Sequence, residues 1–212
     1  MNKIRIAVVD DHRLFREGII LVLDQLENIE VVFDAGSGSE FLQHLSQISI
    51  DLVLMDIEMP ELSGIQTTIR ALQVKPDLHV IALTMFSDTG HYEQMIHAGA
   101  HGFILKKSSK FELLEAISTV NQGGSYLSPE IVKKINCHQL PIRSNVEGFT
   151  SREFEIMHLV CQGYTSQEIS MKLCISYKTV ETHRSNLFLK SEVRNSAGLI
   201  VWAIKNHYYT IS

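Results

Sequence analysis

Apolar residues in the first 123 positions alternate between short unbroken runs and longer stretches with helical spacing. Such short runs suit strands buried on both faces, and the longer stretches suit helices that bury one side. The runs predict five strands, near residues 7–9, 30–35, 52–55, 79–84 and 102–105. The helical spacing predicts helices at residues 12–26, 39–45, 65–74, 90–98 and 110–121. Strands alternating with helices in this order predict an α/β fold, a doubly wound five-stranded parallel sheet.

The pattern changes after residue 123. Residues 122–125 read Gln-Gly-Gly-Ser, and Ser128 before Pro129 predicts the start of a short helix. Residues 137–148 are polar and lack a clear period. From residue 149 onward we predict a small all-α domain of four short helices, with a tight turn at 174–176 between the second and the third. The domains are therefore expected at 1–123 and 149–212, joined by a linker at 124–148.

Several of these helices begin at recognisable capping residues. Ser109, Thr150 and Thr165 are each followed three positions later by Glu, which is the pattern of a capping box. Ser176 is a candidate cap for the helix that follows the tight turn. His97 and His101 have the spacing of a metal-binding pair on a helix, but Gly99 between them predicts that the helix ends there.

Composition adds an expectation about the location of the protein. Apolar residues make up 45% of the chain and charged residues 20%, as in globular domains. No stretch approaches the ~18 apolar residues of a membrane span, and the first apolar run is too short for a signal peptide. We expect a cytoplasmic protein with no membrane partner. Cys137, Cys161 and Cys174 lack a CxxC spacing and are interpreted as plain thiols.

Charge is distributed unevenly along the chain. Residues 1–148 hold 12 Lys and Arg against 19 Asp and Glu, a net charge of −7, whereas residues 149–212 hold 7 against 5, a net charge of +2. This difference permits nucleic-acid binding by the second domain. A net charge of +2 does not by itself establish it.

Acidic residues stand at the ends of two predicted strands. Asp56 follows the apolar run 52–55, and Asp10 with Asp11 follows the run at 7–9. The carboxyl ends of strands in open parallel sheets are the usual ligand-binding edge. Three carboxylates with pKa values near ~4 would repel one another unless a cation joined them, and a hard ion such as Mg²⁺ suits oxygen ligands. Asp56 is the candidate phosphate acceptor; the alternative is that it caps the following turn.

Two further strand ends carry complementary groups. The predicted strand at 79–84 ends in the Thr84 hydroxyl, and the one at 102–105 is followed by the Lys106 ammonium. Phosphoryl transfer needs a nucleophile, charge neutralisation and hydrogen-bond donors, which Asp56, a metal ion, Thr84 and Lys106 would supply. Taken singly, Thr84 could be an ordinary strand residue and Lys106 a solvated lysine.

These residues together resemble the receiver domains of two-component response regulators, over Ile4 to about Gly123. The string Asp-Ile-x-Met-Pro-x-x-x-Gly at 56–64 is highly characteristic of that family. The resemblance implies a flavodoxin-like receiver fold and a sensor histidine kinase as partner. It also implies that Asp10, Asp11, Asp56 and the backbone carbonyl of Glu58 hold Mg²⁺, that Thr84 and Lys106 stabilise the phosphate, and that Phe103 is the switch aromatic. Lys107 departs from the family pattern, where an acidic or small residue is common.

The third helix of the second domain is the candidate DNA-recognition element. The pattern of the second domain from Phe149 to about Lys205, with Gly163, Glu168, Thr179, Val180 and Asn186 at matching positions, resembles the LuxR-type DNA-binding domain. Without that resemblance the helix would read as a solvated amphipathic helix. The candidate contacts to phosphates and base edges are Lys178, Thr179, Glu181, Thr182, His183, Arg184, Ser185 and Lys190. Glu181 and Ser185 stand where some relatives carry basic residues, and His183 and Val180 are candidates for the core-facing side.

Together, the two domains resemble a response regulator of the NarL/FixJ type. They imply a transcription factor switched by aspartyl phosphate, which binds double-stranded DNA at a pseudo-palindromic operator as a homodimer when phosphorylated. Leu199, Ile200 and Trp202 of the last helix are candidates for the dimer surface, with core packing as their alternative role. Activation by unmasking of the recognition helix and activation by dimerisation both remain open. The protein is not expected to be an enzyme, apart from slow self-dephosphorylation.

Two other classes of function compete with this interpretation. A dehalogenase-like phosphatase also places an acid two residues after a nucleophilic Asp, as in Asp56-Ile57-Glu58. A phosphorylation-dependent adaptor whose second domain binds only protein would fit the weak charge of +2.

Overall fold

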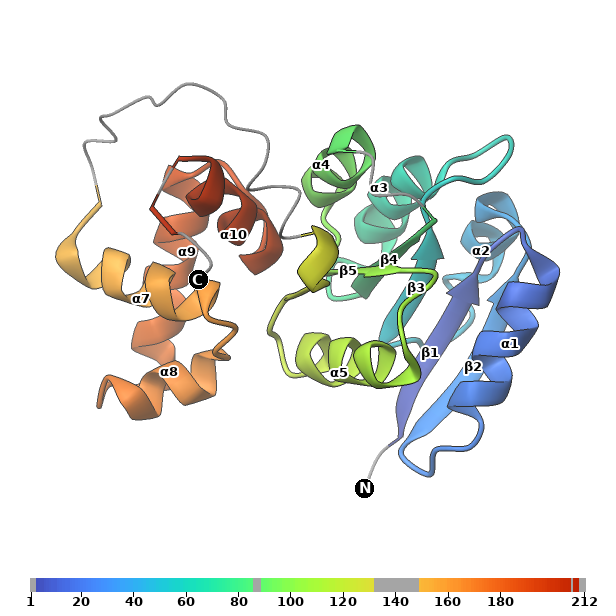
Figure 1. Ribbon diagram of the computed structural model, residues 1–212, viewed down its shortest axis with the longest axis horizontal. Coiled ribbons are helices and arrows are strands. Elements are labelled where there is room, and N and C mark those ends of the chain that lie inside the picture. Colours follow the sequence, from blue (N-terminus) through green and yellow to red (C-terminus); the bar gives the residue numbers. More distant parts are fainter. Residues whose placement is uncertain (1–2, 86–88, 132–148, 207, 210–212) are drawn as a thin grey trace.

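The computed structural model describes residues 3–85, 89–131, 149–206 and 208–209, which form a sheet-containing domain and a helical domain (Figure 1). The predicted linker from residue 132 onward, with Cys137, lies outside the described residues. None of the helices in the described part has the length and apolar character needed to span a membrane.

The first domain contains a parallel sheet with the strand order β2-β1-β3-β4-β5-β6. The strands are β1 (Ile4–Val9), β2 (Ile29–Ala35), β3 (Leu52–Asp56), β4 (His79–Thr84), β5 (Gly102–Leu105) and β6 (Tyr126–Leu127). All five strands expected from the apolar runs are present. The order changes direction at β1, where β2 lies on one side and β3 on the other, so that a binding crevice is expected at the carboxyl ends of β1 and β3.

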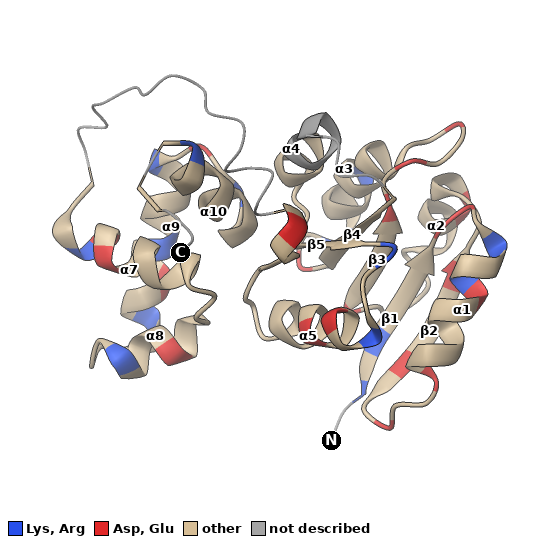
Figure 2. Ribbon diagram, in the orientation of Figure 1, with Lys and Arg blue, Asp and Glu red and all other residues tan. Residues whose placement is uncertain are grey.

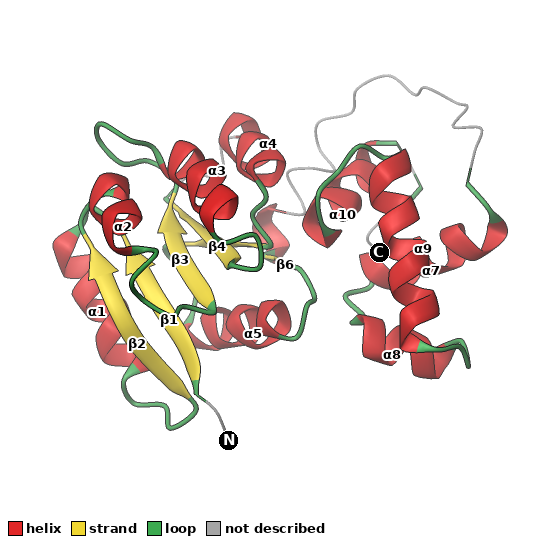
Figure 3. Cartoon of the chain, turned by 180° about the vertical axis from the view of Figure 1, so that it is seen from behind, coloured by secondary structure: helices red, strands yellow, loops and turns green. Residues whose placement is uncertain are grey.

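Five helices cover the two faces of this sheet, as the alternating pattern predicts. They are α1 (Arg13–Leu23), α2 (Gly38–His44), α3 (Gly64–Val74), α4 (Thr89–Ala98) and α5 (Lys110–Asn121). Helices α1 and α5 lie on one face, and α2, α3 and α4 lie on the other (Figures 1 and 3). Successive strand residues supply both cores: Ile6 and Val8 pack with α1 and α5, whereas Ala7 and Val9 pack with the opposite layer.

The sixth strand, β6, is not predicted by the apolar pattern. Tyr126 and Leu127 pair in parallel with Gly102 and Phe103 of β5. Two residues are too few to show an alternating period, and the preceding Gly-Gly-Ser reads as a break. The sheet therefore continues past residue 123, the expected end of the first domain. Residues 129–131 are helical, where the short helix is expected to start.

The second domain consists of α7 (Ser151–Cys161), α8 (Ser166–Lys172), α9 (Tyr177–Lys190) and α10 (Ser196–Lys205). Thr150 with Glu153 and Thr165 with Glu168 form the two expected capping boxes. Ser176 accepts a hydrogen bond from the Thr179 N–H and so begins α9. The turn between α8 and α9 includes Cys174 at a φ of 51°. Helices α8 and α9 with this tight turn form the predicted helix-turn-helix.

The two domains contact each other through α4 and α10. Gly198 lies in this contact, because a Cβ atom there would lie 3.3 Å from Cγ2 of Ile96 in the first domain and 2.9 Å from Cβ of Val193 in its own domain. Glycine at this position allows α10 to pack against the receiver side. Lysines, arginines and acidic residues are mixed on the helices of the second domain (Figure 2), in keeping with its small net charge.

Candidate phosphoacceptor site and DNA interface

The carboxylates of Asp10 and Asp56 meet at the carboxyl edge of the sheet. Asp56 is the last residue of β3, and Asp10 directly follows the adjacent β1. Asp10 is fully buried and Asp56 is 2% exposed. The Lys106 ammonium joins them, with Nζ 2.7 Å from Oδ2 of Asp10 and 2.8 Å from Oδ2 of Asp56. The structure thus brings three of the predicted site residues into direct contact.

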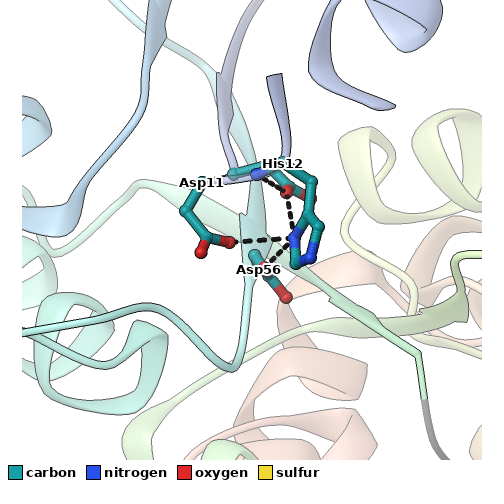
Figure 4. Close-up of side chains that lie close together, drawn as sticks. Asp11, His12 and Asp56 are labelled. Carbon is teal, nitrogen blue, oxygen red and sulfur yellow. Dashed lines mark hydrogen bonds and ion pairs between the residues drawn. The ribbon is translucent and has the colours of Figure 1, made fainter. Parts of the chain in front are cut away.

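Asp11 and His12 complete one side of this cluster (Figure 4). The His12 Nδ1 atom lies 2.9 Å from Oδ1 of Asp11, 3.3 Å from Oδ1 of Asp10 and 3.9 Å from Oδ2 of Asp56. One donor atom from each of these four residues lies within 4.8 Å of the others. Three carboxylates this close provide oxygen donors suited to a hard divalent cation such as Mg²⁺. His12 is a member of the site that the sequence motif did not indicate.

Burial is the main electrostatic influence on Asp56. It raises the pKa of Asp56 to about 6, although the hydrogen bond from Lys106 acts in the opposite direction; the Asp10 charge adds to the increase. The carboxylate is then mostly ionised at pH 7, as a nucleophile must be, while its negative charge is only partly compensated. A bound divalent cation would favour the ionised form further.

The loop after Asp56 folds back tightly against the end of β3. The Gly64 N–H donates to the Ile57 carbonyl, and a Cβ atom on Gly64 would lie 1.8 Å from the Asp56 carbonyl oxygen. Only glycine permits this approach, which explains the last residue of the Asp-Ile-x-Met-Pro-x-x-x-Gly string. The Glu58 N–H points to Oδ1 of Asp56 at 3.4 Å, so that Glu58 lies beside the acceptor. The role of its carbonyl as a metal ligand stays a prediction.

Thr84 and Phe103 occupy neighbouring strands near this edge. Thr84 ends β4, is 8% exposed, and its carbonyl accepts a hydrogen bond from the Lys106 N–H at 2.7 Å. Phe103 is fully buried in the layer shared by α3 and α4. Sheet pairing aligns Thr84 with Leu105, the residue before Lys106. The expected roles of Thr84 in phosphate binding and of Phe103 in switching are predictions that fit these positions.

The candidate DNA-contacting residues of α9 divide into exposed and buried groups. Lys178, Thr179, Thr182, Ser185 and Lys190 are exposed. His183 is half-buried, and the Glu181 carboxylate accepts a hydrogen bond from the Ser166 hydroxyl. Lys190 is paired with Glu153 at 2.7 Å. The exposed members form the part of α9 that is available to nucleic acid in this conformation.

Arg184, a candidate DNA contact, is buried in this conformation. Its side chain is 6% exposed and donates to the Ser166 and Ser196 hydroxyls and, at 3.4 Å, to the Gly123 carbonyl of the first domain. Helix geometry explains the result, because positions 180, 184 and 187 share one face and Val180 and Leu187 are core residues. In this structure Arg184 connects α8, α9 and α10 and reaches the end of α5.

A second set of interdomain hydrogen bonds was not indicated by the sequence. The Asn195 side-chain amide donates to the carbonyls of Gly99 and Ala100, both at 2.9 Å, and Arg194 donates to the Ala98 carbonyl at 3.3 Å. Carbonyls at a helix C-terminus lack partners within the helix. The second domain therefore satisfies the end of α4, which Gly99 terminates at a φ of 115°. His101 lies beyond this turn and accepts a hydrogen bond from the Val80 N–H, so the expected end of the helix between His97 and His101 is confirmed.

The last helix is largely buried. Leu199 is fully buried and Ile200 is 6% exposed, and both belong to the connected apolar core. Trp202 is half-buried and stacks on Tyr208 with ring centroids 5.4 Å apart. In this conformation Leu199 and Ile200 have the core-packing role that was the alternative to a dimer surface.

Comparison with known proteins identifies the class that this fold and site define. Residues 6–118 match the response regulator receiver domain, and residues 147–203 match the LuxR family of bacterial regulatory proteins. The chain belongs to the two-component response regulators of the NarL/FixJ type, which are DNA-binding transcriptional regulators. This assignment decides against the phosphatase and adaptor alternatives.

Particular relatives match over nearly the whole chain. The response regulator GacA of Pseudomonas viridiflava is 34% identical, covering 96% of each chain. The transcriptional regulatory protein DegU of Brevibacillus brevis is 32% identical, covering 99% of this chain and 97% of its own. Among solved structures, the response regulator ChrA of a heme-sensing two-component system is similar with 29% identity and a TM-score of 0.54, over 99% of this chain and 100% of its own.

Proposed function

We propose that Asp56 accepts a phosphoryl group from a sensor histidine kinase and that this modification controls DNA binding by the second domain. The proposal rests on the position of the Lys106 ammonium at the edge of a parallel sheet. Its Nζ atom lies 2.7 Å from the Asp10 carboxylate and 2.8 Å from the Asp56 carboxylate. A buried, ionised carboxylate beside a cation is suited to attack phosphorus and to hold the charged product.

The residues have separable roles in the transfer. A carboxylate oxygen of Asp56 forms a bond to phosphorus as the bond from phosphorus to the kinase histidine nitrogen breaks, and the electron pair leaves with that nitrogen. Asp10, Asp11, Asp56 and the Glu58 carbonyl would hold Mg²⁺, which supplies charge neutralisation for the phosphoryl oxygens when bound. Lys106 exchanges its contact with the Asp56 carboxylate for one with the new phosphate, and the Thr84 hydroxyl donates to a phosphate oxygen.

The modified site would act on the second domain through α4. The phosphate adds a charge of roughly −2 at the end of β3 and draws in Thr84 and Lys106, with inward turning of Phe103 as the switch. Phe103 shares its apolar layer with Met95 and Ile96 of α4, and the end of α4 is held by Asn195. Movement of α4 would release α10 and the neighbouring recognition helix α9. This supports unmasking, followed by pairing of two copies through freed parts of α10, including Trp202.

Double-stranded DNA is the proposed target, read by α9 through Lys178, Thr179, Thr182 and Ser185. A homodimer would meet a pseudo-palindromic operator, one half-site for each copy. Because the proposed partner is DNA, the proposed site of action is the cytoplasm. Slow self-dephosphorylation through water attack on the aspartyl phosphate would return the protein to its starting state.

Intact mass measurement after treatment with acetyl phosphate and Mg²⁺ tests the acceptor. The wild-type chain should gain one phosphoryl group, and Asp56→Asn should gain none. Asp51→Asn, which changes an exposed acid just before the same strand, is the matched control and should label like wild type. Equal labelling of Asp56→Asn would overturn the site.

Selection of bound genomic DNA with and without acetyl phosphate tests the second part of the proposal. Specific fragments should be enriched only, or more strongly, after phosphorylation.

A further inference from the structure

His12 occupies the N-cap position of α1 without acting as a cap. Its side chain makes no hydrogen bond to the helix, and the first turn of α1 carries no acidic residue. At each of the other helices whose N-cap is described, a Ser, Thr or Asn side chain accepts a hydrogen bond from the first turn. A missing cap costs about 1 kcal/mol. The imidazole is directed instead toward the acidic cluster (Figure 4).

The backbone holds this residue at the edge of the site. The His12 N–H donates to Oδ1 of Asp10 at 2.8 Å, so that main chain and side chain both face the same carboxylate. The side chain is 58% exposed, which leaves an open path for an ion from solvent. Lys106 Nζ lies 3.5 Å from the His12 Nδ1 atom, on the inner side of the cluster.

The separations between donor atoms match those around a single ion. Ligands that each lie about 2.0–2.2 Å from one metal are themselves about 3 Å apart in tetrahedral or octahedral arrangements. The His12 Nδ1 atom is 2.9 Å from Asp11 and 3.3 Å from Asp10. The imidazole nitrogen therefore has the spacing of a neighbouring ligand relative to two carboxylates.

We propose that His12 is a nitrogen ligand of the divalent-cation site and makes the site favour borderline first-row ions. The inference rests on the proposed cation site at Asp10, Asp11 and Asp56. Imidazole suits ions such as Co²⁺, Ni²⁺ and Zn²⁺, whereas Mg²⁺ favours oxygen and gains little from it. His12 thus determines which metal ion occupies the receiver at low free concentrations. Mg²⁺ binding depends on the oxygen ligands and not on His12.

Titration calorimetry of the full-length, tag-free protein with Ni²⁺ and with Mg²⁺ tests this assignment. The variant His12→Asn replaces the nitrogen donor with an amide oxygen and keeps a polar side chain. Its Ni²⁺ affinity should fall by about tenfold or more, because imidazole is the better ligand for this ion, while its Mg²⁺ affinity should change by less than about twofold. His44→Asn, an exposed histidine at the end of α2, is the matched control and should leave both affinities unchanged.

Pulsed electron paramagnetic resonance of bound Cu²⁺, an ion that imidazole suits, supplies a direct readout of the ligand. The wild-type spectrum should show modulation from a coordinated imidazole ¹⁴N, which His12→Asn should lack. Equal Ni²⁺ affinities in wild type and His12→Asn, or no ¹⁴N signal in the wild type, would overturn the role of His12. If Asp56 in the same samples still accepted a phosphoryl group in the presence of Mg²⁺, the proposed acceptor function would stand. Absence of both labelling and Mg²⁺ binding in the wild type would instead reject the site itself.

Discussion

The ammonium of Lys106 lies 2.8 Å from the Asp56 carboxylate, and both side chains are almost fully buried. The ion pair does not fully offset the burial of the acid, since the pKa of Asp56 is still raised to about 6. The ionised acceptor is therefore a source of instability that the fold tolerates at its functional site.

We expect Asp56→Asn to stabilise the metal-free protein at pH 7. A carboxyl group whose pKa is raised in the folded state destabilises the fold above that pKa, and the effect disappears as the pH falls toward the ordinary value of 3.8. A difference of about two pKa units corresponds to about 1–3 kcal/mol. Urea unfolding with EDTA at pH 7.5 and pH 5 should show a gain that is smaller at the lower pH. A loss of stability at pH 7.5 would contradict the expectation.

The half-buried His101 should make stability depend on pH in the opposite direction. Burial and then the neighbouring His79 lower the pKa of His101 to about 4, from 6.5. The unfolded chain takes up the proton first, so stability is full above pH 6.5 and falls as the pH drops toward 4, by at most about 3 kcal/mol. His101→Gln should flatten this fall in urea unfolding curves between pH 7 and 5. His158→Gln, an exposed histidine on α7, should keep the wild-type slope.

The convergence of the acceptor site was predictable because a parallel sheet fixes where strand ends lie. Asp10, Asp56 and Lys106 each follow an apolar run, and the carboxyl ends of parallel strands lie at the same edge of the sheet. His12 was not predicted, since its role depends on the direction of a ring at a helix start. The two-residue β6 was too short to produce a periodic signal.

The contacts of the second domain were harder to predict for different reasons. Arg184 shares a helix face with Val180 and Leu187, so its burial was visible in the spacing; the polarity of arginine argued for exposure. Asn195 donates to backbone carbonyls 96 and 95 positions away along the chain. Every residue has a backbone carbonyl, so the residue types do not indicate which carbonyls Asn195 will contact. Sequence patterns describe local elements well, and they do not specify which elements of two domains meet.

Lys178→Ala and Arg184→Ala should affect different properties of the protein. Exposed Lys178 can reach a phosphate, so its loss should weaken DNA binding and reduce the slope of log K against log salt by about 1. Loss of buried Arg184 leaves the Ser166 and Ser196 hydroxyls without their donor and should cost about 2–4 kcal/mol of stability. Binding at several salt concentrations and urea unfolding of both variants separate the two effects. An unchanged unfolding curve for Arg184→Ala would contradict its structural role.

Asn195→Asp should separate the two domains while leaving α10 intact. The Asp oxygen can still accept the hydrogen bond that Asn195 Oδ1 receives from the Gly198 N–H, so the helix cap is kept. The amide donor is lost, and a carboxylate then faces the Gly99 and Ala100 carbonyl oxygens at about the present 2.9 Å, which is repulsive. Hydrogen exchange should become faster at the end of α4, and the radius of gyration from small-angle scattering should increase.

The matched control for this variant is Asn206→Asp. Among the described residues, the Asn206 amide donates to the Trp202 carbonyl at the end of α10, so Asn206→Asp changes the same chemical group away from the hydrogen bonds to the first domain. Exchange at the end of α4 and the radius of gyration should then stay at wild-type values. Because the interdomain bonds of Asn195 restrain α10 and α9 together, Asn195→Asp without phosphorylation should also bind DNA more tightly than wild type without phosphorylation. Wild-type exchange and affinity in Asn195→Asp would show that these two hydrogen bonds do not hold the domains together.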